Sequence, residues 1–245
     1  MKKLKIITSI LICVLLLCLF ACAPSIGDDD VSTSAPEQTE KIQELLSLVS
    51  DSFLPDTGNV QGLGSASYSE IYKDVDDMFV KSDDVVVVKV LDKYDIRVNH
   101  SDSGFEPKDT IRYVEVTYSY KNFYEVGDIV PIFQGGWVEE DGRELTMSGT
   151  PLLKPEQSVL LFVKNYDFSE YTDADWAKSF AAPLNEYHGK FYINHDGSII
   201  SSANLMPGGE DVDVVKGSKN LRSFEDVFEL ADKHKALETE NKAEG

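Results

Sequence analysis

The spacing of apolar residues divides the chain into helical and extended segments. Near the start, apolar residues recur every three to four positions over 37–53 and again from about 67 to 81, which predicts two amphipathic helices. A third helix is predicted to begin at Ser223, because this N-cap residue is followed by acidic residues in the first turn. We expect the apolar faces to pack on a sheet; the alternative is a docking groove for a partner.

The middle of the chain has the patterns of strands. Residues 84–91 are mostly valine, which predicts a central strand that is buried on both faces and can continue to Val98. Asp141-Gly142 and Asp196-Gly197 predict tight hairpin turns, and a short helix is predicted over 173–180. The other predicted strands are 110–121, 129–133, 137–138, 145–147, 157–164, 190–194 and 198–201. Short strands without alternating helices predict a mainly β fold with flanking helices, built on a small antiparallel barrel.

The first residues have the plan of an export signal. Lys2, Lys3 and Lys5 precede an uncharged apolar run from Ile6 to Phe20. This run of about 15 residues is shorter than the roughly 20 that a membrane-spanning helix needs. The residues that follow are acidic, hydroxylated or proline, without the basic residues that flank a spanning segment. A cleaved signal therefore fits better than a permanent helix.

The end of this segment, Leu19-Phe20-Ala21-Cys22, resembles the lipobox of bacterial lipoproteins. The resemblance covers residues 1–22. It implies cleavage before Cys22, a diacylglyceryl group on the Cys22 sulfur, and a protein held by lipid on the extracytoplasmic face of the cell membrane. We favour a Gram-positive envelope. The alternative is a plain secretory signal in which Cys22 lies near the cut by chance.

These patterns divide the chain into six parts. The tether is expected to be disordered because it has few apolar residues, and the rest is long enough for one sizeable domain or two small ones. The parts are the signal peptide 1–21, the tether 22–37, an amphipathic helix and loop 38–66, a β-barrel-like domain 67–203, a loop and C-terminal helix 204–238, and a polar tail 239–245.

Charge and cysteine content exclude several classes of function. The chain has 43 acidic and 23 basic residues, a formal net charge of −20, so nucleic acid and anionic headgroups are poor partners. Its three cysteines are Cys13 and Cys18 in the signal and Cys22 at the predicted lipid site. The exported body is then expected to have no disulfide, thiolate nucleophile or cysteine metal ligand.

The sequence shows no catalytic or metal-binding motif. The four histidines, His100, His188, His195 and His234, lack zinc-site spacing. We expect His234 to be a solvated residue near the end of the last helix, and His195 to belong to a turn. A calcium loop starting at Asn99 fails because its twelfth residue is Thr110 rather than glutamate. We therefore predict no catalytic residue, metal or cofactor.

One tryptophan stands out as a candidate ligand-binding residue. Trp137 follows two glycines and precedes an acidic hairpin, a position from which it could stack on a sugar or anchor a protein. We select Trp137 with Tyr118 and Tyr120 as the candidate binding surface. The alternative is that Trp137 packs over one end of the barrel, as large aromatic residues usually do, and we expect Trp176 to lie in the core.

The order of elements resembles the OB-type barrel of netrin-like and metalloproteinase-inhibitor modules, and of uncharacterised bacterial exported domains. The residues that carry this resemblance are Val126-Gly127-Asp128, Leu152-Leu153-Lys154-Pro155, Leu160-Leu161-Phe162 and Gly189-Lys190-Phe191, within 68–203. The resemblance implies an OB-like barrel. The inhibitors act through a disulfide-bonded amino-terminal cysteine, which this body lacks, so no inhibitory role is implied.

Three classes of function remain open. The first is a binding module that meets a protein or glycan at the cell surface, which needs no catalytic constellation. The second is an extracytoplasmic enzyme with a dispersed acid–base site, which needs a cleft and a group of shifted pKa. The third is an envelope-structural protein that acts through its helices. We rank them in this order.

Overall fold

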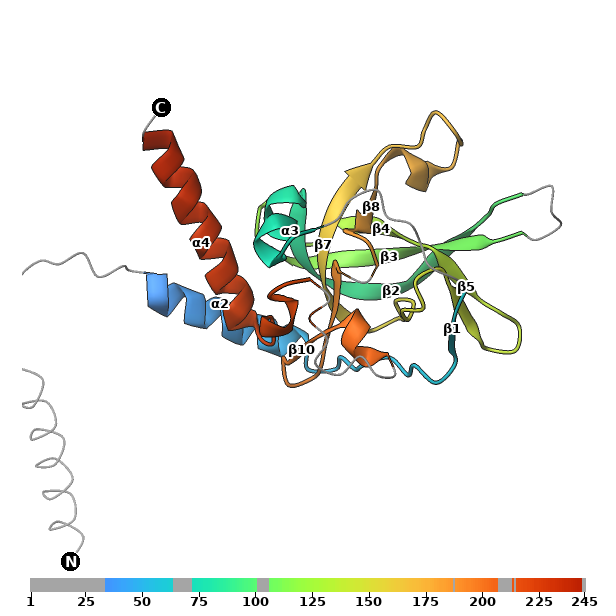
Figure 1. The fold of residues 1–245 in the computed structure, drawn as a ribbon, viewed down its shortest axis with the longest axis horizontal. Helices are drawn as coiled ribbons and strands as arrows, with labels where there is room; N and C mark the ends of the chain where they lie inside the picture. Colours follow the sequence, from blue (N-terminus) through green and yellow to red (C-terminus); the bar gives the residue numbers. More distant parts are fainter. Residues whose placement is uncertain are drawn as a thin grey trace, which may run out of the picture. The chain divides into compact units, whose positions relative to one another are not determined.

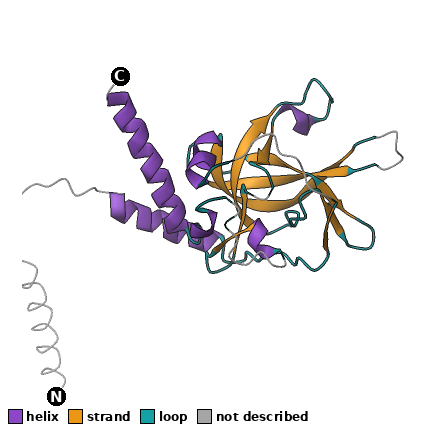
Figure 2. Cartoon of the chain, in the orientation of Figure 1, coloured by secondary structure: helices purple, strands orange, loops and turns teal. Residues whose placement is uncertain are grey.

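The fold comes from a computed structural model (Figures 1 and 2). The structure describes residues 34–63, 72–100, 106–186, 188–206, 213 and 215–243. The predicted signal peptide, Cys22 and nearly all of the tether lie outside the described residues. The helices are α2 (Ser34–Leu48), α3 (Val75–Lys81) and α4 (Phe224–Ala243), with short 3-10 turns η1 (Asp175–Lys178), η2 (Ser202–Leu205) and η3 (Ser218–Asn220).

The strands are β1 (Val60–Gly62), β2 (Asp84–Val98), β3 (Lys108–Ser119), β4 (Ile129–Gln134), β5 (Gly136–Val138), β6 (Glu144–Thr146), β7 (Ser158–Tyr166), β8 (Phe180–Pro183), β9 (Lys190–Ile193) and β10 (Ile199–Ser201). The predicted strands and both hairpins are therefore present, with small differences at their ends. Segment 173–180, which we expected to be a helix, contains only η1 and the start of β8.

Five strands close into a barrel, in the order β2-β3-β4-β8-β7 and back to β2. This confirms the expected small OB-like barrel with flanking helices. Four of the five pairings are antiparallel, and the fifth, between β4 and β8 at Ile132 and Ala181, is parallel. The sheet continues beyond β7 into β9 and β10. Closure depends on β8, the one barrel strand that the sequence pattern did not predict.

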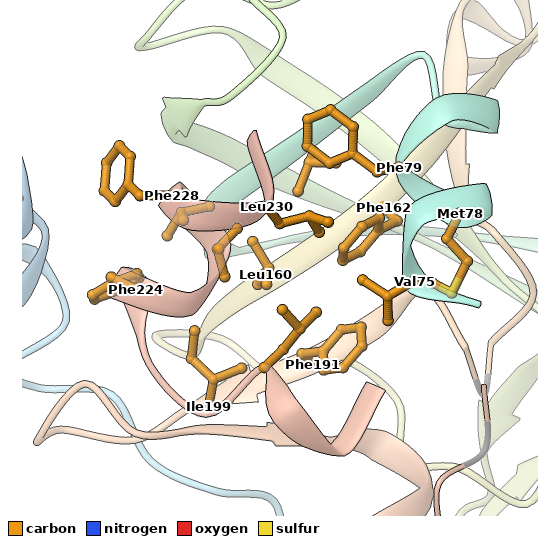
Figure 3. Close-up of a cluster of buried hydrophobic side chains, with 14 of the residues drawn as sticks. Val75, Met78, Phe79, Leu160, Phe162, Phe191, Ile199, Phe224, Phe228 and Leu230 are labelled. Carbon is orange, nitrogen blue, oxygen red and sulfur yellow. The ribbon is translucent and has the colours of Figure 1, made fainter. Parts of the chain in front are cut away.

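Strand β2 has one apolar core on each side. Val86, Val88 and Val90 point into the barrel and pack with residues from β3, β4 and β7. Val85 and Val87 point outward into a second core, which the three helices cover. Figure 3 shows this helix-side core, where residues of α3 and α4 meet those of β7, β9 and β10. Both valine faces are almost completely buried, so the prediction of a central strand is confirmed.

A third core lies on the outer face of β3 and β4. Ile111 of β3 packs there with Trp176, Ala177 and Phe180, all of which come from the β7–β8 connection or from the start of β8. Trp176 is 9% exposed, so the prediction that it lies in a core is confirmed. The helices thus cover one part of the barrel's outer face, and the β7–β8 connection covers another.

A small second sheet joins β1, β6 and β5. Strands β5 and β6 form the hairpin predicted around Asp141-Gly142, and β1 pairs in parallel with β6. The chain bends into β5 at Gly136, whose φ of +157° comes with a backbone so close that a Cβ would lie 2.5 Å from the Leu145 carbonyl oxygen. Glycine is needed at this bend because any side chain would collide with β6.

Helices α3 and α4 are joined by a polar contact. Asp76 Oδ1 lies 2.6 Å from Lys233 Nζ and 3.0 Å from His234 Nε2. The His234 ring stacks on Phe79 at 4.7 Å and is 9% exposed, so the expectation of a solvated histidine is wrong. Helix α4 also continues through most of the predicted polar tail, to Ala243, since glutamate, lysine and alanine favour helix without needing a buried face.

A buried carboxylate organises the β3–β4 connection. Asp84, at the start of β2, is 0% exposed and accepts five hydrogen bonds of 2.7–3.1 Å. The donors are the Ser119 hydroxyl and the backbone amides of Val85, Lys121, Phe123 and Tyr124. One side chain therefore replaces the ladder bonds that this segment lacks, and holds it against the end of β2.

We predict that Asp84→Asn lowers the free energy of unfolding by about 3 kcal/mol, because the new amide group faces donors that lose their acceptor. Urea denaturation followed by circular dichroism measures the change. Asp92→Asn is the matched control, since Asp92 is exposed on the same strand, and should change stability by less than about 0.5 kcal/mol. Equal midpoints for the two variants would contradict this role of Asp84.

Candidate functional site

The three residues selected from the sequence do not form one surface. Tyr118 and Tyr120 pack edge-on against each other and against Phe228 of α4, at 4.8–5.4 Å between ring centroids. Trp137 lies on β5 and is 4% exposed, in agreement with the alternative interpretation that it is buried.

Trp137 and the tyrosine pair Tyr118 and Tyr120 lie near opposite ends of β3. The Thr110 hydroxyl of β3 donates to the carbonyl of Gly136, next to Trp137, at 2.7 Å. Tyr118 is eight residues further along the same strand, which at about 3.4 Å per residue puts it roughly 25 Å away. A binding role for any one of the three stays a prediction, but they cannot contact one small ligand together.

A buried polar cluster lies under the β6–β7 connection. The Lys190 amine and the Tyr192 hydroxyl both donate to the carbonyl of Pro151, at 2.6 and 2.7 Å. Burial lowers the pKa of Lys190, and the carboxylates of Glu186 and Glu144 oppose that shift. Glu144 itself pairs with Lys154 at 2.8 Å.

This cluster has the shifted pKa that an acid–base enzyme needs, but not the access. Lys190 is 1% exposed and Tyr192 is 0% exposed, so a substrate cannot reach either group in this conformation. The Glu186 carboxylate accepts from the Gly135 amide and the Ser148 hydroxyl. The arrangement fastens the β6–β7 connection to β9 through Lys190 and Tyr192, and to the β8–β9 connection through Glu186, which is a structural role.

An aromatic cluster on the outer face of β3, β4 and β8 is the more promising site; we call it the aromatic face. Phe180, at its centre, contacts four other rings at centroid distances of 4.9–5.9 Å. Those rings belong to Phe133, Tyr166, Phe168 and Trp176. One more ring from the β7–β8 connection, that of Tyr171, packs edge-on against Phe168 at 5.8 Å.

The aromatic face combines a buried base with an exposed rim. Phe180 and Trp176 are 2% and 9% exposed, whereas Tyr166 and Tyr171 are 42% and 79% exposed. Exposed rings that are held by buried rings lose little conformational freedom when a ligand stacks on them. This is the geometry of a binding platform.

Polar groups of the β2–β3 hairpin border the aromatic face. The Tyr113 hydroxyl donates to Asp95 at 2.8 Å, and the Lys93 amine lies 3.7 Å from the centroid of the Tyr113 ring. Burial, with the Asp95 hydrogen bond, raises the pKa of Tyr113 to about 12, so its hydroxyl stays protonated at neutral pH. The border thus offers an ammonium, a carboxylate and hydroxyls for hydrogen bonding.

The sequence contains a signal for this site that the choice of Trp137 overlooked. Five aromatic residues occur between 166 and 180, a density seldom found in a surface connection. Tyr113 and Phe133 come from distant strands, and only the barrel topology brings them beside this segment.

Comparisons with family models, with curated proteins and with solved structures found no match to this chain. Among the described residues, no helix is long and apolar enough to cross a membrane. Within the same residues, no three histidine, cysteine or acidic side chains are grouped so as to hold a metal ion.

We predict a large loss of stability from a substitution at the base of the aromatic face and almost none from a substitution at its rim. Phe180→Ala should lower the free energy of unfolding by about 3–5 kcal/mol, because it leaves a cavity among four rings. Tyr171→Ala should change it by less than about 0.5 kcal/mol, because that ring is mostly in solvent. Chemical denaturation measures both; a large loss on Tyr171→Ala would show that the exposed ring supports the fold rather than a ligand.

Proposed function

We propose that this chain is a lipid-anchored extracytoplasmic binding module that holds an uncharged glycan on its aromatic face. The observation that carries the proposal is the pair of exposed tyrosines, Tyr166 and Tyr171, supported from below by Phe168, Trp176 and Phe180. The anchor rests on the sequence Leu19-Phe20-Ala21-Cys22, which precedes the described residues.

An uncharged glycan fits the chemistry of the surface better than a charged polymer. Sugar rings present apolar C–H faces to aromatic rings and hydroxyls to neighbouring polar groups, which the aromatic face and its border both supply. The net charge of −20 repels phosphate-rich polymers. A protein partner would also use exposed tyrosines, and the binding experiment below separates the two.

A lipid anchor would keep the aromatic face near a ligand at the cell surface. A body held by lipid on Cys22 stays close to the membrane surface and to the polymers found there. Binding needs only modest affinity in this setting, because the anchor keeps the module close to its ligand.

We predict that Tyr166→Ala and Tyr171→Ala each weaken binding to neutral oligosaccharides by about 5- to 30-fold, since a stacked ring contributes roughly 1–2 kcal/mol. A glycan array identifies the ligand and calorimetry gives the affinities. Tyr94→Ala is the matched control, because Tyr94 is 55% exposed on the opposite face of the β2–β3 hairpin and should leave the affinity unchanged. Binding to proteins but to no glycan would overturn the ligand class.

We predict that Cys22→Ser abolishes incorporation of labelled palmitate and leaves the protein either released from the membrane fraction or uncleaved before residue 22, because serine has no thiol to accept the diacylglyceryl group. Metabolic labelling and fractionation measure this, with Cys18→Ser, inside the predicted signal, as the control that should still be lipidated. A Cys22→Ser protein that remains membrane-bound and lipidated would disprove the anchor.

A further inference from the structure

A pocket lies between β10 and the turn that leads into α4. Its volume is about 300 Å³, which is the small end of the range for ligand pockets. Two of its lining residues, Ile199 and Leu221, are 3% and 6% exposed and belong to the helix-side core. The two walls are tied together, because the Ile199 amide donates to the Arg222 carbonyl at 2.8 Å. The pocket is therefore formed by fixed structure rather than by loosely packed surface.

The charge of this pocket is opposite to that of the chain. Lys219 and Arg222 line it, and none of its described lining residues is acidic, although the chain carries a net charge of −20. Arg222 Nε donates to the Lys219 carbonyl at 2.9 Å, which folds the guanidinium side chain back over the same turn. Both cations thus belong to one wall.

Two carboxylates on adjoining turns are engaged by the backbone. Asp213 accepts from the amides of Gly217 and Lys219, and Asp226 accepts from the amides of Arg222 and Ser223. These bonds shape the turn that carries the two cations. They also offset part of the negative charge that would otherwise repel an anion from the pocket.

A buried hydroxyl at the same place has no partner. Ser201 lines the pocket and is 4% exposed, and its Oγ makes no hydrogen bond to any described residue. Buried polar groups in folded proteins are nearly always paired, and an exception calls for a bound water or ligand. The Ser201 Oγ atom is closed to solvent in this conformation, so the hydroxyl lies within the pocket wall rather than among the groups that face a ligand.

We propose that this pocket binds a small carboxylate with a short apolar tail. The carboxylate pairs with Lys219 and Arg222 at the turn, and the tail lies against Ile199 and Leu221. The volume excludes a polymer, so this site is separate from the aromatic face and does not depend on the proposed glycan function.

Methyl NMR spectra of the isotopically labelled full chain test the proposal, with pentanoate as the probe. The methyl signals of Ile199, Ile200 and Leu221 should shift saturably as pentanoate is added. Pentanamide, which has the same shape without the charge, should bind at least about tenfold more weakly, because it loses the charge-assisted hydrogen bonds. Equal shifts with the amide, or no saturable shift with pentanoate, would overturn the proposal.

Variants separate the pocket from other surfaces. The double variant Lys219→Gln, Arg222→Gln should weaken pentanoate binding at least about tenfold. Lys178→Gln, an exposed lysine beside the aromatic face, and Tyr171→Ala should leave it unchanged. Inorganic phosphate is the competing probe: saturable binding of phosphate without pentanoate would overturn the carboxylate assignment, and so would full binding by the double variant.

Discussion

The hydrogen bonds of the Asp84 carboxylate fix the position of the strand on which the rest of the structure is built. Strand β2 has valines on both faces, so moving it by one residue would exchange one apolar face for the other at little cost in burial. That slip would, however, remove Asp84 from the five donors around it and leave a charge buried without partners. The polar residue therefore supplies the specificity that the valines cannot.

Much of the barrel follows from local sequence, but its closure does not. The valine run, the alternating strand β3 and the two Asp-Gly hairpins were predictable because their patterns depend on nearby residues. Strand β8 was missed because Phe180–Pro183 is too short to show a period, and it becomes a strand only through pairing with β4 and β7. The buried His234 was missed for the same reason, since Phe79 and Asp76 lie far away in sequence.

The candidate sites were also predictable only where they depend on residues close together in the sequence. The pattern at residues 1–22 that predicts an export signal is local, so predicting it requires no knowledge of the fold. The aromatic face needs Phe133 from β4 beside residues 166–180, and the small pocket needs β10 beside the turn at 218–222. Trp137 was selected as a tryptophan that follows two glycines, yet Gly136 is needed for the close approach of the backbone to β6, and the Trp137 ring is buried. The exposed tyrosines of the aromatic face lie instead at the end of β7 (Tyr166) and on the β7–β8 connection (Tyr171).

The position of β8 late in the chain affects how the protein folds during synthesis. A ribosome finishes the valine strand long before it makes β7, which pairs along one edge of that strand, and β8, which completes the ring. During that interval β3 can pair with one edge of the valine strand, but the other edge stays open to a neighbouring chain, and such an apolar edge is prone to aggregate. The barrel can therefore close only after residues 84–183 have all been made, and this long separation in sequence favours slow folding.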